Sequence, residues 1–220
     1  MFTMKLLHIT TTALLVTLSQ GAPTKNNSLN FGEDENLIIY RAEYDVVNIL
    51  LPLNAINQEG SEGKTADEKT KTTPIIFFIL ADTKDNRTDF KGLYVRKRGV
   101  VTKLLEDGKD VTAEMAKDVK TAYFATSNGV YSYNAKENKA EKYGNITDDF
   151  TQIAKCNGSD LIYVVNKNHV LYKITEFGTT MEEIPEVVNA NEIMLDYENN
   201  LFFTSGRKVY VFNGNSVKKI

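Results

Sequence analysis

Residues 201–212, LFFTSGRKVYVF, carry the pattern that decides the fold: two short β-rich runs separated by a polar turn. The same pattern occurs at residues 161–172, LIYVVNKNHVLY, and at residues 122–133, AYFATSNGVYSY, so that successive copies begin 39 and 40 residues apart. The runs are β-branched and aromatic and lack helical apolar spacing, so each repeat is expected to be a small antiparallel sheet. A period near 40 built from short strands is typical of a β-propeller blade.

A fourth copy of the pattern lies upstream. Residues 75–78, IIFF, and 92–95, GLYV, match its two runs, and an insertion at 81–91 lengthens the turn between them. The basic residues 96–99, RKRG, then lead into another β-rich run at 100–105. A convertase cleavage site is one interpretation of this basic segment. We favour a solvated hairpin tip, because turns and sheet edges commonly carry such residues.

These repeats predict an all-β fold, a single β-propeller of about five or six four-stranded blades with an irregular first blade. We expect the aromatic runs to be the inner strands of the blades, and residues 37–54 to form a fifth, degenerate unit. Equivalent strands of successive blades are expected to carry Tyr94, Tyr131, Tyr172 and Tyr210.

The first 21 residues have the features of a secretory signal peptide. Lys5 precedes an apolar stretch at 6–18, and Ser19-Gln20-Gly21 predicts cleavage before Ala22. The apolar stretch is too short to span a bilayer stably, so we expect a secreted, soluble protein without a membrane anchor. A tail at 22–36 would then precede the propeller domain at 37–220, which contains a flexible polar loop at 54–73.

Four sequons for N-glycosylation agree with secretion, and their asparagines are Asn26, Asn86, Asn145 and Asn157. The blade pattern puts Asn145 in a loop between two blades and Asn157 in the turn between the first two strands of the next blade. Such loops emerge on opposite faces of a propeller, and we expect both asparagines to be exposed and Asn157 to be glycosylated.

The composition excludes several classes of site. A net charge of −3 without a basic stripe gives no electrostatic footprint for nucleic acid or anionic membrane. Removal of the signal leaves His169 as the one histidine, which we interpret as an exposed turn residue rather than a catalytic base. Cys156, the one cysteine, rules out an internal disulfide and is expected to be buried on an inner strand.

Carboxylates give the sharpest enzymatic alternative. Asp148 and Asp149 lie in a loop that leads into a new blade, and Asn189 and Asn191 occupy the comparable loop one repeat later. Converging carboxylate and amide oxygens hold calcium, as in propeller lactonases, so a metal-dependent lactonase is the alternative function. We favour the simpler interpretation that Asp148 and Asp149 are a solvated, turn-forming pair.

Aromatic residues are the positive signal for binding. Most must pack between blades, but a few that face a central cavity would suit a flat, conjugated ligand. The candidate ligand-binding residues are Tyr123, Tyr163 and Phe202 on the aromatic strands, with Asn128 and Asn166 at turns of the same face. A surface that binds another secreted protein is a third possibility, without a specific motif.

Several motifs resemble those of the lepidopteran ommochrome-binding proteins. They are the segment 76–82, IFFILAD, with 90–94, FKGLY; the segment 128–134, NGVYSYN; and the segment 195–203, LDYENNLFF. The resemblance spans about residues 37–220. The chain differs from the family in lacking cysteines near its N-terminus and in its longer polar loop at 54–73.

The resemblance implies a secreted haemolymph carrier of an ommochrome pigment, which is a planar, tryptophan-derived chromophore. The sequence therefore predicts a non-catalytic, monomeric binding protein that needs no cofactor. Calcium would be required only by the lactonase alternative.

Overall fold

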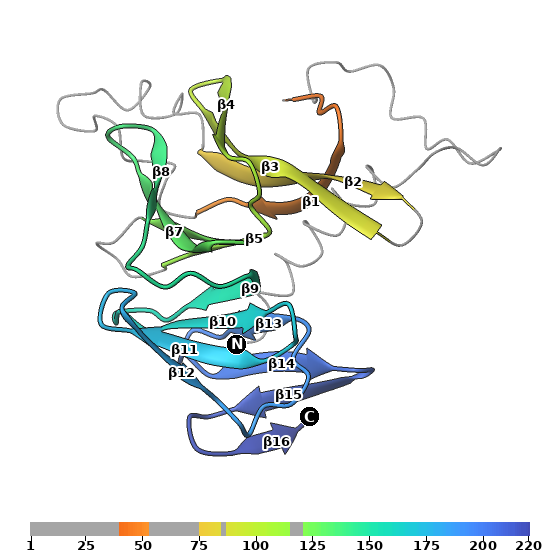
Figure 1. Cartoon of the computed structure of the whole chain (residues 1–220), viewed down its shortest axis with the longest axis vertical. Coiled ribbons are helices and arrows are strands. Elements are labelled where there is room, and N and C mark those ends of the chain that lie inside the picture. The colour runs from red at the N-terminus through yellow and green to blue at the C-terminus, as the bar shows by residue number, and fades with distance from the viewer. Residues whose placement is uncertain (1–39, 53–74, 85–86, 115–120) are drawn as a thin grey trace, which may run out of the picture.

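The computed structural model describes residues 40–52, 75–84, 87–114 and 121–220, and these residues form sixteen strands in four antiparallel sheets (Figure 1). The strands of the first two sheets are β1 (Asp45–Leu50), β2 (Ile76–Lys84), β3 (Arg87–Lys97), β4 (Val100–Leu105), β5 (Asp110–Ala113), β6 (Ala122–Thr126), β7 (Gly129–Asn134) and β8 (Lys139–Lys142). Those of the third and fourth sheets are β9 (Phe150–Lys155), β10 (Ile162–Asn166), β11 (Leu171–Thr175), β12 (Thr180–Glu183), β13 (Ile193–Leu195), β14 (Leu201–Ser205), β15 (Lys208–Phe212) and β16 (Val217–Lys219). No helix in this part of the chain is long and apolar enough to cross a membrane.

Each sheet contains four consecutive strands, paired in sequence order. The first strands of successive sheets contact one another: β1 contacts β5, β5 contacts β9, and β9 contacts β13. The sheets are thus successive blades with their first strands on the inside, and the predicted all-β propeller class is confirmed.

Two details of the prediction are corrected. The described residues form four blades rather than five or six, because β1 is the inner strand of the first blade and not part of a separate unit. The aromatic runs are the second strands β2, β6, β10 and β14 rather than the innermost ones. The third strands do carry Tyr94, Tyr131, Tyr172 and Tyr210, as expected.

The first blade is irregular because of its insertion. The pairing of β2 with β3 continues through the insertion as far as Lys84 and Arg87, so the added residues lengthen a hairpin. A β-bulge lies where the added length joins the blade, at Leu80 and Gly92. Gly92 has φ 126°, and a Cβ there would lie 2.6 Å from the carbonyl oxygen of Leu105, so the bulge requires glycine.

The basic segment is a hairpin tip, as favoured. Strand β3 ends at Lys97 and β4 begins at Val100. The two residues between them, Arg98 and Gly99, take positive φ angles of 52° and 81°. A two-residue turn with both φ angles positive has a twist that matches the flanking strands.

The cores lie between neighbouring sheets, and the second strands β2, β6 and β10 are buried on both sides. Phe77 and Phe124 meet between the first and second sheets, with ring centroids 5.5 Å apart. In β10, Ile162 faces the second sheet, whereas its neighbour Tyr163 faces the fourth. This two-sided burial explains why the aromatic runs dominate the sequence. Cys156 is buried beside β9 as expected, and burial raises the pKa of its thiol to about 11.

Candidate functional site

Two of the three aromatic residues predicted to bind the ligand lie inside the inter-sheet cores. Tyr123 is 7% exposed and packs between the second and third sheets, whereas Tyr163 is 8% exposed and packs between the third and fourth. The two rings therefore lie on opposite faces of the third sheet, in different cores. Tyr123 and Tyr163 therefore do not line one common cavity.

Tyr123 instead packs against charged groups of the protein itself. The Nζ atom of Lys155 lies 5.6 Å from the ring centroid, 3.4 Å from a carboxylate oxygen of Glu114 and 2.8 Å from the carbonyl oxygen of Cys156. Lys155 also donates to the carbonyl oxygen of Ser159. Burial raises the pKa of Tyr123 to about 12, so this phenol stays neutral and packs as a core residue.

Phe202 has a different environment from the other two aromatics. On β14 its neighbours Leu201 and Phe203 pack towards the third sheet, so Phe202 points the opposite way. Its cross-strand partners on this outward face are Met194 and Val211, and the row ends at Lys218.

The outward face of the fourth sheet is apolar and partly uncovered. Met194 is 44% exposed, Phe202 and Val211 are half-buried, and Val209 in the adjacent row is 46% exposed. Exposed apolar side chains are ordinary when scattered, but contiguous ones commonly mark a binding surface. Among the three aromatic residues predicted to bind the ligand, Phe202 is thus the one that the structure leaves accessible.

The two predicted asparagines lie at equivalent turns, as expected. Asn128 is exposed at the turn between β6 and β7, and its backbone N–H donates to the hydroxyl of Thr126. Asn166 is buried, and its Oδ1 accepts from the backbone N–H groups of Asn168 and Val170. The side chain of Asn166 therefore closes a turn.

The carboxylates of the lactonase alternative already have partners within the protein. Asp148 Oδ1 accepts from the backbone N–H of Asp149 at 2.7 Å, and Asp149 forms an ion pair with Lys109. Asn189 and Asn191 are exposed in the loop before β13, which is the comparable loop one blade later. No group of three or more His, Cys, Asp or Glu side chains within the described ranges is placed to hold a metal ion.

The remaining predicted turn residues are located as follows. His169 is exposed with φ 63° between β10 and β11, as expected. Asn145 is exposed between β8 and β9, whereas Asn157 is half-buried between β9 and β10, with its backbone N–H donating to Asn199 Oδ1 at 2.7 Å. The loops fall as predicted, but Asn157 is less exposed than expected. Asn26 and Asn86 lie outside the described residues.

The inner strands contain a set of residues that the repeat pattern did not reveal. Asn48, Asp110 and Gln152 pair with Ile79, Ala125 and Val165 at equivalent positions of the first three blades. In the fourth blade, Glu192 takes this position, because its carbonyl oxygen and N–H both bond to Thr204. Each blade therefore contributes one polar side chain at the same level of the inner strands. In the second, third and fourth blades this polar residue lies 15, 13 and 12 positions before its second-strand partner, whereas in the first blade the separation is 31 positions.

Asp110 is the buried member of this set. Its Oδ1 accepts from Asn48 Nδ2 at 2.5 Å and from the backbone N–H of Val111 at 2.8 Å, and its Oδ2 accepts from the backbone N–H of Ile153 at 2.8 Å. Burial, with a smaller contribution from the charge of Glu192, raises the pKa of Asp110 from 3.8 to about 7, against the opposing effect of the hydrogen bonds.

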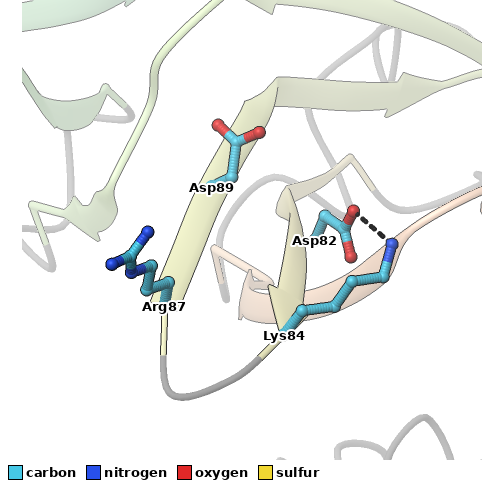
Figure 2. A pocket seen from close by; sticks show the side chains of 4 residues that line it. All are labelled: Asp82, Lys84, Arg87 and Asp89. Atoms are coloured by element: carbon cyan, nitrogen blue, oxygen red, sulfur yellow. Dashed lines mark hydrogen bonds and ion pairs between the residues drawn. The ribbon is translucent and has the colours of Figure 1, made fainter.

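An open pocket lies at the end of the β2–β3 hairpin (Figure 2). It is lined by Asp82 and Lys84 on one strand and by Arg87 and Asp89 on the other. Lys84 pairs with Asp82 at 2.9 Å, and Lys91 pairs with Asp89 at 2.5 Å. Because each carboxylate already has a lysine partner at an exposed hairpin end, we assign no ligand to this pocket.

Comparison with known proteins identifies similar solved structures but no family. No protein-family model matches the chain, and no curated protein matches it in sequence. The "extracellular domain of the putative hybrid two component system BT3049 from B. thetaiotaomicron" superposes with a TM-score of 0.51 and 12% identity, over 68% of this chain and 22% of that one. The corresponding domain of BT4673 from the same organism gives a TM-score of 0.49 and 13% identity, over 67% of this chain and 20% of that one.

A gluconolactonase, XC5397 from Xanthomonas campestris, is similar at a TM-score of 0.44 and 11% identity, over 65% of this chain and 57% of its own. The chain spans about a fifth of the length of the two extracellular domains. At these identities the similarity concerns the fold alone.

Proposed function

We propose that the protein is a secreted, non-catalytic binding protein that holds a small planar aromatic ligand against the outward face of its fourth sheet. The observation that carries the proposal is the uncovered row of Met194, Phe202 and Val211. A flat ring can stack on Phe202, and the flexible thioether of Met194 adapts to the ring edge.

The polar end of the row supports binding of a ligand with a polar substituent. Lys218 pairs with Val211 and lies on the same face as Phe202, whereas its neighbour Lys219 pairs with Tyr210 on the opposite face. A ligand that covers Phe202 and Val211 can therefore reach one ammonium group. Apolar contact area with a few polar groups for orientation is the usual composition of a small-molecule site.

The proposal also includes an extracellular location and a pigment as the ligand. Secretion is supported by the signal-peptide features of residues 1–21 and by the sequons. The motif at 128–134 and the segment 195–203, which leads into Phe202, resemble the ommochrome-binding proteins. We therefore propose an ommochrome-type, tryptophan-derived pigment as the ligand.

Visible absorption spectroscopy with purified protein and xanthommatin tests this function. The wild-type protein should shift the pigment spectrum, and Phe202→Ala should weaken binding by about tenfold, which corresponds to the loss of about 1.4 kcal/mol of ring contact. Phe177→Ala is the matched control, because Phe177 is a 74% exposed phenylalanine in the turn between β11 and β12 of the third sheet. An unshifted spectrum with wild-type protein, or equal affinity of the Phe202→Ala and Phe177→Ala variants, would contradict the proposal.

A further inference from the structure

One side chain connects the inner strands of three blades. The carboxyl of Asp110, on β5, accepts a hydrogen bond from the Asn48 side chain on β1 and another from the backbone of Ile153 on β9. Both partners are far away in sequence, and the carboxyl is buried. A buried group that bonds to separate elements restrains their relative positions, and removal of such a group leaves its donors unsatisfied.

The fourth blade acts on the same carboxyl through its charge. Glu192 occupies the equivalent inner position of that blade, and its carboxylate disfavours a negative charge on Asp110. Glu192 is exposed, whereas Asp110 is 8% exposed. All four blades thus influence one buried acid at the inside of the fold.

We propose that Asp110 is a proton-linked latch for the packing of the four blades. With a proton bound, the carboxyl is a neutral buried group between three inner strands. Without the proton, a buried anion faces the negative charge of Glu192. The blades therefore pack more stably when the latch is protonated.

The other charged groups near the latch are already paired or lie farther along their strands. Lys109 and Asp149 pair with each other, Lys155 pairs with Glu114, and Lys84 pairs with Asp82. The elements packed on β5 also carry Asp45 on β1 and Tyr123 on β6, and the phenol of Tyr123 stays neutral. Glu192 is the group outside β5 whose charge raises the pKa of Asp110.

The sign of the pH dependence follows from proton linkage. The pKa of Asp110 is about 7 in the folded protein and near its ordinary value of 3.8 in the unfolded chain. Between these two pH values the folded state holds a proton that the unfolded state has lost, so stability falls as pH rises. The latch contribution is complete below about pH 4, is lost through about pH 7 and is constant above it.

Thermal unfolding of the full chain from about pH 4.5 to 8.5 tests the latch. Asp110→Asn keeps the size of the side chain but binds no proton. The difference in Tm between the wild type and Asp110→Asn should fall as pH rises to about 7 and then stay constant. A difference that does not change with pH would overturn the proposal.

A second measurement applies even where Asp110→Asn fails to fold. In ¹³C NMR of wild-type protein labelled at the aspartate carboxyls, one signal should titrate near pH 7, and it should titrate at lower pH in Glu192→Gln. Glu186→Gln, an exposed glutamate in the same loop, is the control and should leave that titration unchanged. A protein in which all aspartate carboxyls titrate below about pH 5, or in which Glu192→Gln behaves as the control, would also overturn the proposal.

Discussion

At the scale of single residues, the structure gives several predicted ligand residues a structural role instead. Tyr123 was expected at a cavity because it is aromatic and lies on a repeated strand, but a strand with sheets on both sides buries both of its faces. The pattern of apolar residues in these runs does not distinguish a strand buried on both faces from a strand with one open face. Phe202 has an accessible face because no described blade packs on the outward side of the fourth sheet. This is visible only once all four sheets have been placed in the structure.

The buried cation beside Tyr123 gives a prediction at this scale. Lys155→Met should destabilise the protein by about 3–5 kcal/mol, because the carboxylate of Glu114 would be left buried without its partner. Combining Lys155→Met with Glu114→Gln should recover part of this loss, since no uncompensated charge remains. Urea unfolding measures both effects, and a double variant as unstable as the single one would contradict this explanation.

At the scale of elements, the strands that the sequence predicts best are the aromatic and β-branched ones. The second and third strands stand out as aromatic and β-branched runs, so the equivalent positions of Tyr131 and Tyr172 could be predicted. Two of the inner strands are very short, DVTA at 110–113 and IML at 193–195. A three- or four-residue strand carries too little pattern to be recognised alone, and for this reason Asp110 and Glu192 were missed.

The bulge in the first blade gives a prediction for an element. Gly92→Ala should destabilise the protein by more than about 2 kcal/mol, because the new Cβ would meet the backbone of Leu105 and the positive φ is strained as well. Gly99→Ala is the matched control, with a positive φ but no atom within 4 Å of the new Cβ, and should cost about 1–2 kcal/mol. Equal midpoints for the two variants in urea unfolding would show that the close approach at Gly92 has no energetic effect.

At the scale of the whole molecule, the repeat period predicted the propeller class but not the number of blades. The prediction was about five or six blades, whereas the first blade uses a longer stretch of chain because of its extended hairpin and the separation of β1 and β2 in sequence. In Figure 1 the sheets follow one another from β1–β4 to β13–β16, which leaves the fourth sheet at the end of the series. The proposed ligand face is a consequence of that position, so the sequence alone could identify Phe202 but not explain its accessibility.

Methyl NMR of methionines tests the proposed ligand face most directly. Met194 lies next to Phe202 on the outward face, whereas Met181 is partly buried and packs in the core between the second and third sheets. Addition of xanthommatin should shift the ¹³C-methyl signal of Met194 progressively and leave that of Met181 in place, because ring currents act only at close range. Pigment binding that moves Met181 and not Met194, or a titration in which neither signal moves, would contradict the assignment of the ligand to the fourth sheet.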